Sequence, residues 1–135
     1  MPELETIDIT ITGLRAHYRR GDFSPRELVA LLRERSARYR DRNIWIYELS
    51  DAEIEPYLVA LDRRSVDDAP LYGIPFAIKD NIDLAGLPTT AGCPEFAYSP
   101  ENNAVVGHFR EGVAWGSYRT RSDSPGVHGP ALNAR

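Results

Sequence analysis

The feature that most constrains the fold is a run of alternating apolar residues that ends in a lysine. Residues 74–79, IPFAIK, carry large apolar side chains at every second position, which is the period of a β-strand. We therefore predict a strand at about residues 73–79, with Lys79 at its carboxyl end. A buried lysine is costly unless its charge is paired or its proton is given up. Two interpretations stay open: the ammonium group reaches solvent or pairs with Asp80 or Asp83, or a neutral lysine serves as a base.

Two helix starts carry the same capping signal. Ser24 and Ser50 each precede a glutamate by three residues, Glu27 and Glu53 respectively. Such a serine accepts a hydrogen bond from the helix amides while the glutamate reaches back to the serine amide. Apolar residues at helical spacing follow both signals. The predicted helices cover residues 25–40 and 51–63.

Other elements are predicted from shorter patterns. A helix over residues 13–20 ends at Gly21, and residues 43–49 read as a short strand. Its aromatic side chains either line a ligand pocket or pack in the core, and core packing is the commoner use of Trp and Tyr. The helix predicted at 25–40 carries several arginines on its outer face. This basic run indicates either a patch for an anionic partner or a solvated helix face. Together the elements predict an α/β fold.

Composition excludes several classes of protein. At 135 residues the chain has room for one small core. Its 16 basic and 20 acidic residues give a net charge of −4, which argues against a nucleic-acid surface. No apolar run approaches the roughly 20 residues needed to span a membrane. A single cysteine favours a reducing compartment, so we predict a cytoplasmic location.

The cysteine and the histidines show no pattern typical of a catalytic or metal site. Cys93 has no supporting histidine motif, and we expect a buried, unreactive thiol. His17, His108 and His128 lack metal-ligand spacing. The sequence therefore predicts no metal and no organic cofactor.

The segment around the lysine resembles a known family. The letters GIPFAIKDNID, followed by LPTTAG, are similar to the lysine-bearing signature of the amidase signature family of amide hydrolases. Cys93 after Thr-Thr-Ala-Gly and the Ile-Trp-Ile run at 44–46 resemble the allophanate hydrolases in particular. The resemblance covers about 24–112, is strongest at 70–100 and is absent from 113–135.

This resemblance implies a fold and a mechanism. The fold would be the N-terminal helices and first core strand of the family's α/β/α architecture, present in part. The mechanism would be of the Ser-Ser-Lys type: one serine attacks the amide carbonyl, a second serine links it to the lysine, and Lys79 takes and returns the proton. The substrate would be a small amide, and in allophanate hydrolases it is allophanate, which is split to ammonia and carbon dioxide in urea degradation.

Of the implied catalytic groups the sequence supplies only Lys79. The serines after the matched region, Ser117, Ser122 and Ser124, lie in no glycine-rich loop, and we assign them no catalytic role. Thr89, Thr90 and Gly92 match the family. We expect the threonine hydroxyl groups to bond backbone in a turn and the glycine to allow its conformation; direct contact with substrate is the alternative. Substrate-binding residues are not identified. We predict that the chain alone is inactive.

Domain organisation follows from the same comparison of segments. Residues 1–64 form an N-terminal helical segment, 65–112 begin the amidase core, and 113–135 form an irregular tail with three arginines and one aspartate. A disturbed reading frame or a divergent tail would each explain the change in composition. The alternative function is that of a non-catalytic fragment acting as a small binding or structural protein. In either case the lysine strand would expose an unpaired edge and favour self-association.

Overall fold

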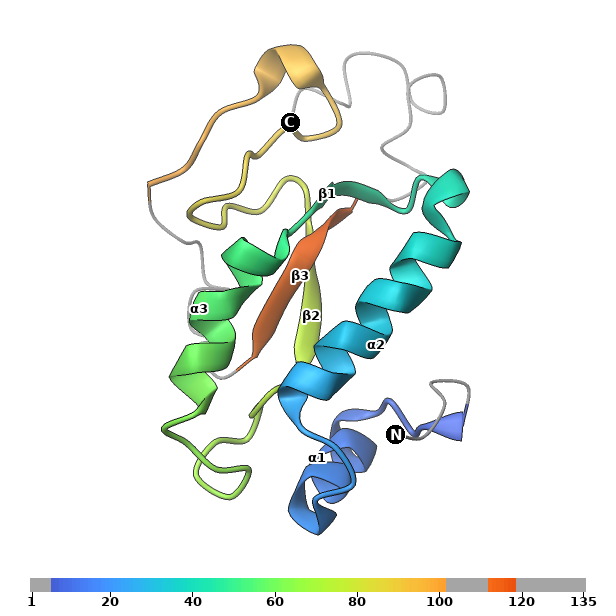
Figure 1. The fold of residues 1–135 in the computed structure, drawn as a ribbon. Coiled ribbons are helices and arrows are strands. Elements are labelled where there is room, and N and C mark those ends of the chain that lie inside the picture. Colours follow the sequence, from blue (N-terminus) through green and yellow to red (C-terminus); the bar gives the residue numbers. More distant parts are fainter. Residues whose placement is uncertain (1–5, 102–111, 119–135) are drawn as a thin grey trace.

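The structure contains the helices and strands expected from the local signals and adds two short 3-10 helices and one strand. The computed structural model describes residues 6–101 and 112–118 (Figure 1). The elements are α1 (Ile11–Arg20), α2 (Pro25–Arg38), the short 3-10 helix η2 (Arg40–Arg42), β1 (Trp45–Glu48), α3 (Asp51–Leu61), β2 (Pro75–Lys79), the 3-10 helix η3 (Pro94–Phe96) and β3 (Val113–Tyr118).

Both predicted capping boxes are confirmed. The Ser24 hydroxyl accepts from the Glu27 amide, and the Glu27 carboxylate accepts from the Ser24 amide at 2.7 Å. Ser50 and Glu53 repeat the arrangement at the start of α3, with the amide–carboxylate distance at 2.8 Å. These bonds satisfy amide groups that a helix start otherwise leaves without partners. Helix α1 ends where predicted, because Gly21 adopts the left-handed conformation at φ 72°.

The three strands form one sheet in the order β1-β3-β2. Strand β3 runs antiparallel to β1 and parallel to β2, so the last of the described strands is the central one (Figure 1). Gly116 lies where β3 passes closest to β1. A Cβ atom there would lie 2.4 Å from the carbonyl oxygen of Tyr47, so only glycine fits this position.

The irregular tail predicted for residues 113–135 is therefore wrong for its first part. Residues 113–118 form β3, in which Val113 and Ala114 are buried. The local pattern of this segment is weak, but two neighbouring strands supply its hydrogen-bond partners and tertiary context overrides local propensity. Residues 102–111 and 119–135 lie outside the described residues.

Two apolar clusters make up the core. The larger cluster joins α2 and α3 to the sheet; its members are Val29, Leu49, Ile54, Leu58, Leu61, Ile78, Leu84, Leu87, Val113 and Ala114. Trp45 and Tyr47 of β1 pack against it as expected. The smaller cluster joins α1 to α2 through Ile7, Leu14, Phe23 and Leu28. The larger core contains residues from both sides of the boundary predicted at residue 64, so the two segments pack as one unit.

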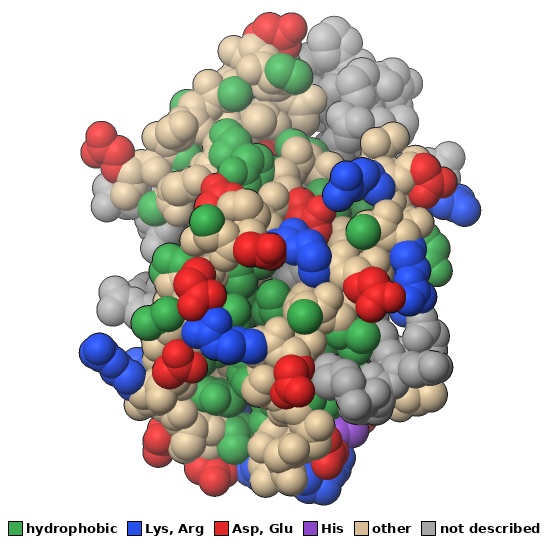
Figure 2. All heavy atoms as spheres, viewed as in Figure 1, with side chains coloured by type: hydrophobic (Ala, Val, Ile, Leu, Met, Phe, Trp, Pro, Cys, Tyr) green, Lys and Arg blue, Asp and Glu red, His purple; other side chains and the backbone are tan. Residues whose placement is uncertain are grey.

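Arginines on α2 serve contacts within the molecule. Arg33 donates to the Leu49 carbonyl at 2.6 Å and lies 3.1 Å from the Asp51 carboxylate. Arg26 pairs with Glu55 of α3 at 2.9 Å. Figure 2 shows acidic and basic side chains interspersed over this face rather than a patch of one sign. Exposed pairs of this kind contribute little stability individually, but they bring carboxylates next to the charges of Arg26 and Arg33. Among the described residues no helix is both long and apolar enough to cross a membrane.

Candidate functional site

Lys79 is the last residue of β2 and the single lysine in the sequence. Its side chain is partly buried, and its backbone pairs in register with Tyr118 of β3. The start of the same strand is fixed by α1. Arg15 donates to the carbonyl of Ala69 at 2.7 Å, and the Tyr18 hydroxyl donates to the Gly73 carbonyl at 2.9 Å. Helix α1 and strand β3 together determine where the lysine backbone lies.

The residue after the lysine, Asp80, is buried and organises the loop that follows. Its carboxylate accepts from the Thr90 amide at 3.2 Å and from the Gly92 amide at 3.0 Å, and also from the Thr90 hydroxyl. Its main-chain carbonyl accepts from the Ala91 amide at 3.1 Å. The loop at residues 90–92 is therefore attached to the end of β2 through one residue.

Asp83 makes a second attachment. Its carboxylate accepts from the Thr89 hydroxyl at 2.8 Å and from the Tyr98 hydroxyl. That hydrogen bond to Asp83 raises the pKa of Tyr98. Thr89 and Tyr98 also exchange backbone hydrogen bonds at 2.9 and 3.1 Å. Asp80 and Asp83 are the two aspartates that the sequence offered as possible partners of Lys79. Both carboxylates accept hydrogen bonds from residues 89–98.

The matched residues after the lysine have the local role predicted, with one correction. Gly92 adopts φ 75°, a conformation that other residues avoid. The hydroxyl groups of Thr89 and Thr90, however, donate to aspartate carboxylates and not to backbone groups. Sequence reasoning missed Asp80 and Asp83 as the acceptors. The available signal was two acidic residues within four positions after a buried strand, with two threonines six to ten residues beyond them.

The structure corrects the prediction that the Cys93 thiol is buried. Cys93 is partly exposed rather than buried, and its thiol donates to Glu95 at 3.1 Å. His17 lies 2.7 Å from the Asp22 carboxylate, and its ring packs against Phe23 of the smaller core cluster with the ring centroids 5.0 Å apart. The part of the chain that the structure describes contains no cluster of potential metal ligands. The sequence analysis assigned no catalytic or metal-binding role to the remaining histidines and serines. Ser117 is a residue of β3. The others lie outside the described residues: His108, His128, Ser122 and Ser124.

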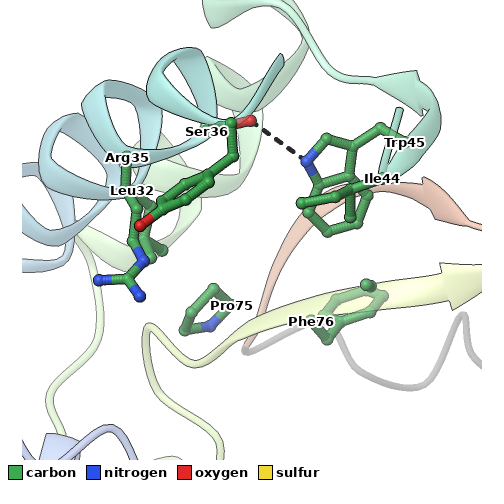
Figure 3. A pocket seen from close by; sticks show the side chains of 9 residues that line it. Leu32, Arg35, Ser36, Ile44, Trp45, Pro75 and Phe76 are labelled. Carbon is green, nitrogen blue, oxygen red and sulfur yellow. Dashed lines mark hydrogen bonds between the residues drawn. The ribbon is translucent and has the colours of Figure 1, made fainter. Parts of the chain in front are cut away.

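An apolar hollow of about 300 Å³ lies between α2, β1 and the start of β2 (Figure 3). It is lined by Leu32, Arg35, Ser36, Tyr39, Ile44, Trp45, Pro75, Phe76 and Ala77. The Trp45 indole donates to the Ser36 hydroxyl at 3.2 Å across one side. Ala77 is the lining residue nearest to Lys79 along β2, two residues before it and about 7 Å away along the strand. Lys79 itself is not among the lining residues.

A family model described as Amidase matches residues 27–112, so the chain belongs to the amidase family. It is similar to urea amidolyase from Saccharomyces cerevisiae, with 45% identity over 65 residues, which is 47% of this chain and 4% of that protein. Among solved structures, allophanate hydrolase from Kluyveromyces lactis has a TM-score of 0.67 and 27% identity, covering 84% of this chain and 19% of that chain.

Peptide amidase from Stenotrophomonas maltophilia is similarly related, with a TM-score of 0.68 and 26% identity over 87% of this chain and 25% of that chain. The matched parts of this chain therefore span between 4% and 25% of the length of these three proteins. The likeness to urea amidolyase and allophanate hydrolase agrees with the resemblance found in the sequence.

Proposed function

We propose that Lys79 is the proton acceptor of an amide hydrolase that acts on small linear amides, with allophanate as the first candidate substrate. The observation that carries the proposal is the position of Lys79 within the family match, at the carboxyl end of β2 and directly before the ordered loop of Asp80. Similarity to allophanate hydrolase and urea amidolyase supports the substrate class.

In the proposed reaction each group has one task. A serine attacks the amide carbonyl while its proton passes through a second serine to the neutral amine of Lys79. The C–N bond then breaks, and the proton returns from the lysine to the leaving nitrogen, which departs as ammonia. Water hydrolyses the acyl-serine by the same proton route. The lysine is suited to this role only where it is neutral for part of the cycle.

We also propose that the 135-residue chain does not catalyse this reaction by itself. Its sequence contains no Gly-Gly-Ser-Ser stretch, and so supplies neither the serine nucleophile nor the backbone donors of such a loop. One missing oxyanion donor alone costs about 2.7–4 kcal/mol of transition-state stabilisation. Purified chain incubated with allophanate or acetamide should release no ammonia above background. Release that Lys79→Ala abolishes would contradict this part of the proposal.

A chimera tests the role of the lysine. Residues 25–118 would replace the matching segment of Kluyveromyces lactis allophanate hydrolase, and ammonia release from allophanate would be measured. Lys79→Ala and Lys79→Arg should both lower the rate by about 10² or more, because a general base contributes this much and arginine stays protonated. Arg42→Ala, which removes an exposed cation beside Asp41, is the matched control. A Lys79→Ala chimera as active as the control would refute the assignment.

Self-association is a further proposal about this chain. Within residues 6–101 and 112–118, β2 has a strand partner on one side only, β3. An edge of this kind is able to pair with another chain, although Pro75 and Lys79 at its two ends oppose such pairing. Sedimentation velocity across a range of concentrations should detect dimers. A single monomer species at the highest concentration would rule out this association.

We propose a cytoplasmic location as well, because Cys93 is a free, partly exposed thiol and such thiols persist in reducing compartments. Fractionation of cells that express the protein, with detection by antibody, would test this location. Recovery in the membrane or secreted fraction would contradict it.

A further inference from the structure

Three successive backbone amides converge on one residue next to the lysine. The amides of Thr90 and Gly92 donate to the Asp80 carboxylate, and the amide of Ala91 donates to the Asp80 main-chain carbonyl. The Thr90 hydroxyl adds a fourth bond. Asp80 is 2% exposed, so water competes little with these bonds and each is stronger than at the surface.

Two residues of the loop that makes these bonds have left-handed backbone conformations. Ala91 has φ 51° and Gly92 has φ 75°, and the left-handed region is unfavourable for alanine. Consecutive amides in such a turn form a concave site that binds anions. Here the Asp80 carboxylate occupies that site. These amides are therefore already used by the protein, and we assign them a structural task rather than the binding of a reaction oxyanion.

The backbone of Lys79 is held on both sides by this arrangement. Before it, the ladder between β2 and β3 fixes the strand up to the pair Lys79 and Tyr118. After it, the Lys79 carbonyl accepts from the Ile82 amide at 2.9 Å, which closes a tight turn with Asp80 in its second position. A rotation of the peptide between Lys79 and Asp80 would break the bonds that Asp80 makes to residues 90–92.

We propose that Asp80 is the positioning residue of Lys79. Through its bonds to residues 90–92, the aspartate fixes the direction in which the lysine side chain leaves the end of β2. The Thr90 hydroxyl is the side-chain donor on which this arrangement depends. The proposal rests on the proposed function, since positioning matters only where Lys79 transfers a proton.

The single lysine makes the proposal directly testable on the full chain. Reductive methylation with ¹³C-formaldehyde labels one side-chain amine, and the N-terminal amine gives a separate signal. In untreated protein, the rate of acetylation of Lys79 by an N-hydroxysuccinimide ester is followed by mass spectrometry. The variants are Thr90→Val, which removes the hydroxyl but keeps the shape, Thr90→Ser, which keeps the hydroxyl, and Asp80→Asn. Asp22→Asn, at an exposed carboxylate bonded to His17 and Arg20, is the matched control.

We expect Thr90→Val and Asp80→Asn to accelerate acetylation of Lys79 by about threefold to tenfold, because local opening of the loop exposes the amine. The methyl signal of the labelled lysine should shift in both variants. Thr90→Ser should retain the parent rate and signal, and Asp22→Asn should change neither. A role confined to stability would lower the unfolding midpoint and leave the lysine of the folded protein unchanged.

The proposal is overturned by one combination of results for Thr90→Val. The amides of residues 90–92 exchange faster with solvent, and yet the acetylation rate and the methyl signal of Lys79 keep their parent values. Where Asp80→Asn does not fold, the Thr90 pair decides the outcome alone. None of these measurements requires hydrolysis. The chimera with Lys79→Ala tests the proposed function separately, so the failure of either idea is distinguishable from the failure of the other.

Discussion

The substitution Val113→Ala tests whether β3 is a packed element of this fold. The Val113 side chain is 0% exposed and belongs to the larger core cluster, between α3 and β2. Replacing valine with alanine removes two methyl groups from this site. Each buried methylene-sized group contributes about 0.8 kcal/mol by transfer from water, and an unfilled cavity adds to the loss. We expect the free energy of unfolding to fall by about 1.5–3 kcal/mol.

The assay is equilibrium unfolding in urea, followed by far-ultraviolet circular dichroism. With a urea dependence of about 1–3 kcal/mol per molar for a small protein, the midpoint should fall by about 1 M. Val59→Ala is the matched control, because the same two methyl groups are removed from a side chain of α3 that is 47% exposed. The control should change stability by less than about 0.5 kcal/mol. Equal midpoints for the two variants would refute the placement of Val113 in the core.

Three further perturbations address the capping boxes and the sheet. Ser50→Ala should lower the free energy of unfolding by about 0.5–2 kcal/mol, because the first turn of α3 loses its acceptor; an unchanged urea midpoint would contradict the capping role. A hydrogen bond from the Tyr47 hydroxyl, and to a smaller extent those from the amide and hydroxyl of Ser50, lower the pKa of Glu53 below its ordinary value of 4.5. The ionised carboxylate therefore stabilises the fold above pH 4.5, and this contribution is lost as the pH falls through the pKa of the folded state. Urea midpoints measured between pH 6 and pH 3 should therefore decline more steeply for the parent than for Glu53→Gln, and parallel curves would refute the linkage. Gly116→Ala places a methyl group 2.4 Å from the Tyr47 carbonyl oxygen. It should remove hydrogen-exchange protection from β1 while α2 stays protected. Retained protection in β1 would show that β1 and β3 stay paired in spite of the added methyl group.

The sequence predicted those elements whose signals are local. Helices α2 and α3 begin at Ser-x-x-Glu boxes, and β2 has a two-residue period that ends at Lys79. Strand β3 lacks such a signal, because Gly116 and Ser117 interrupt its apolar pattern. Its conformation depends on two neighbouring strands that are distant in sequence. No window of local sequence contains that information.

The site was predictable to a similar extent. The identity of Lys79 as the candidate base followed from a strand pattern and a family resemblance, both of which involve consecutive residues. The attachment of residues 90–92 to Asp80 spans ten to twelve positions and requires a left-handed backbone at Ala91. An alanine in the sequence does not predict a left-handed conformation, because this region is unfavourable for alanine. The acceptor role of Asp80 therefore became evident only in the folded structure.

The order of strands in the sheet has a consequence for how the protein folds. Within residues 6–101 and 112–118, strands β1 and β2 do not pair with each other, and each pairs with β3, whose residues 113–118 follow both of them in the chain. On the ribosome, neither ladder is able to form until this segment has been synthesised. Contacts of such long sequence separation slow folding. Until β3 is synthesised, the edges of β1 and β2 remain unpaired and are able to associate with other chains. A polypeptide stopped before residue 113 would lose both ladders at once, because it would lack the one strand that they share.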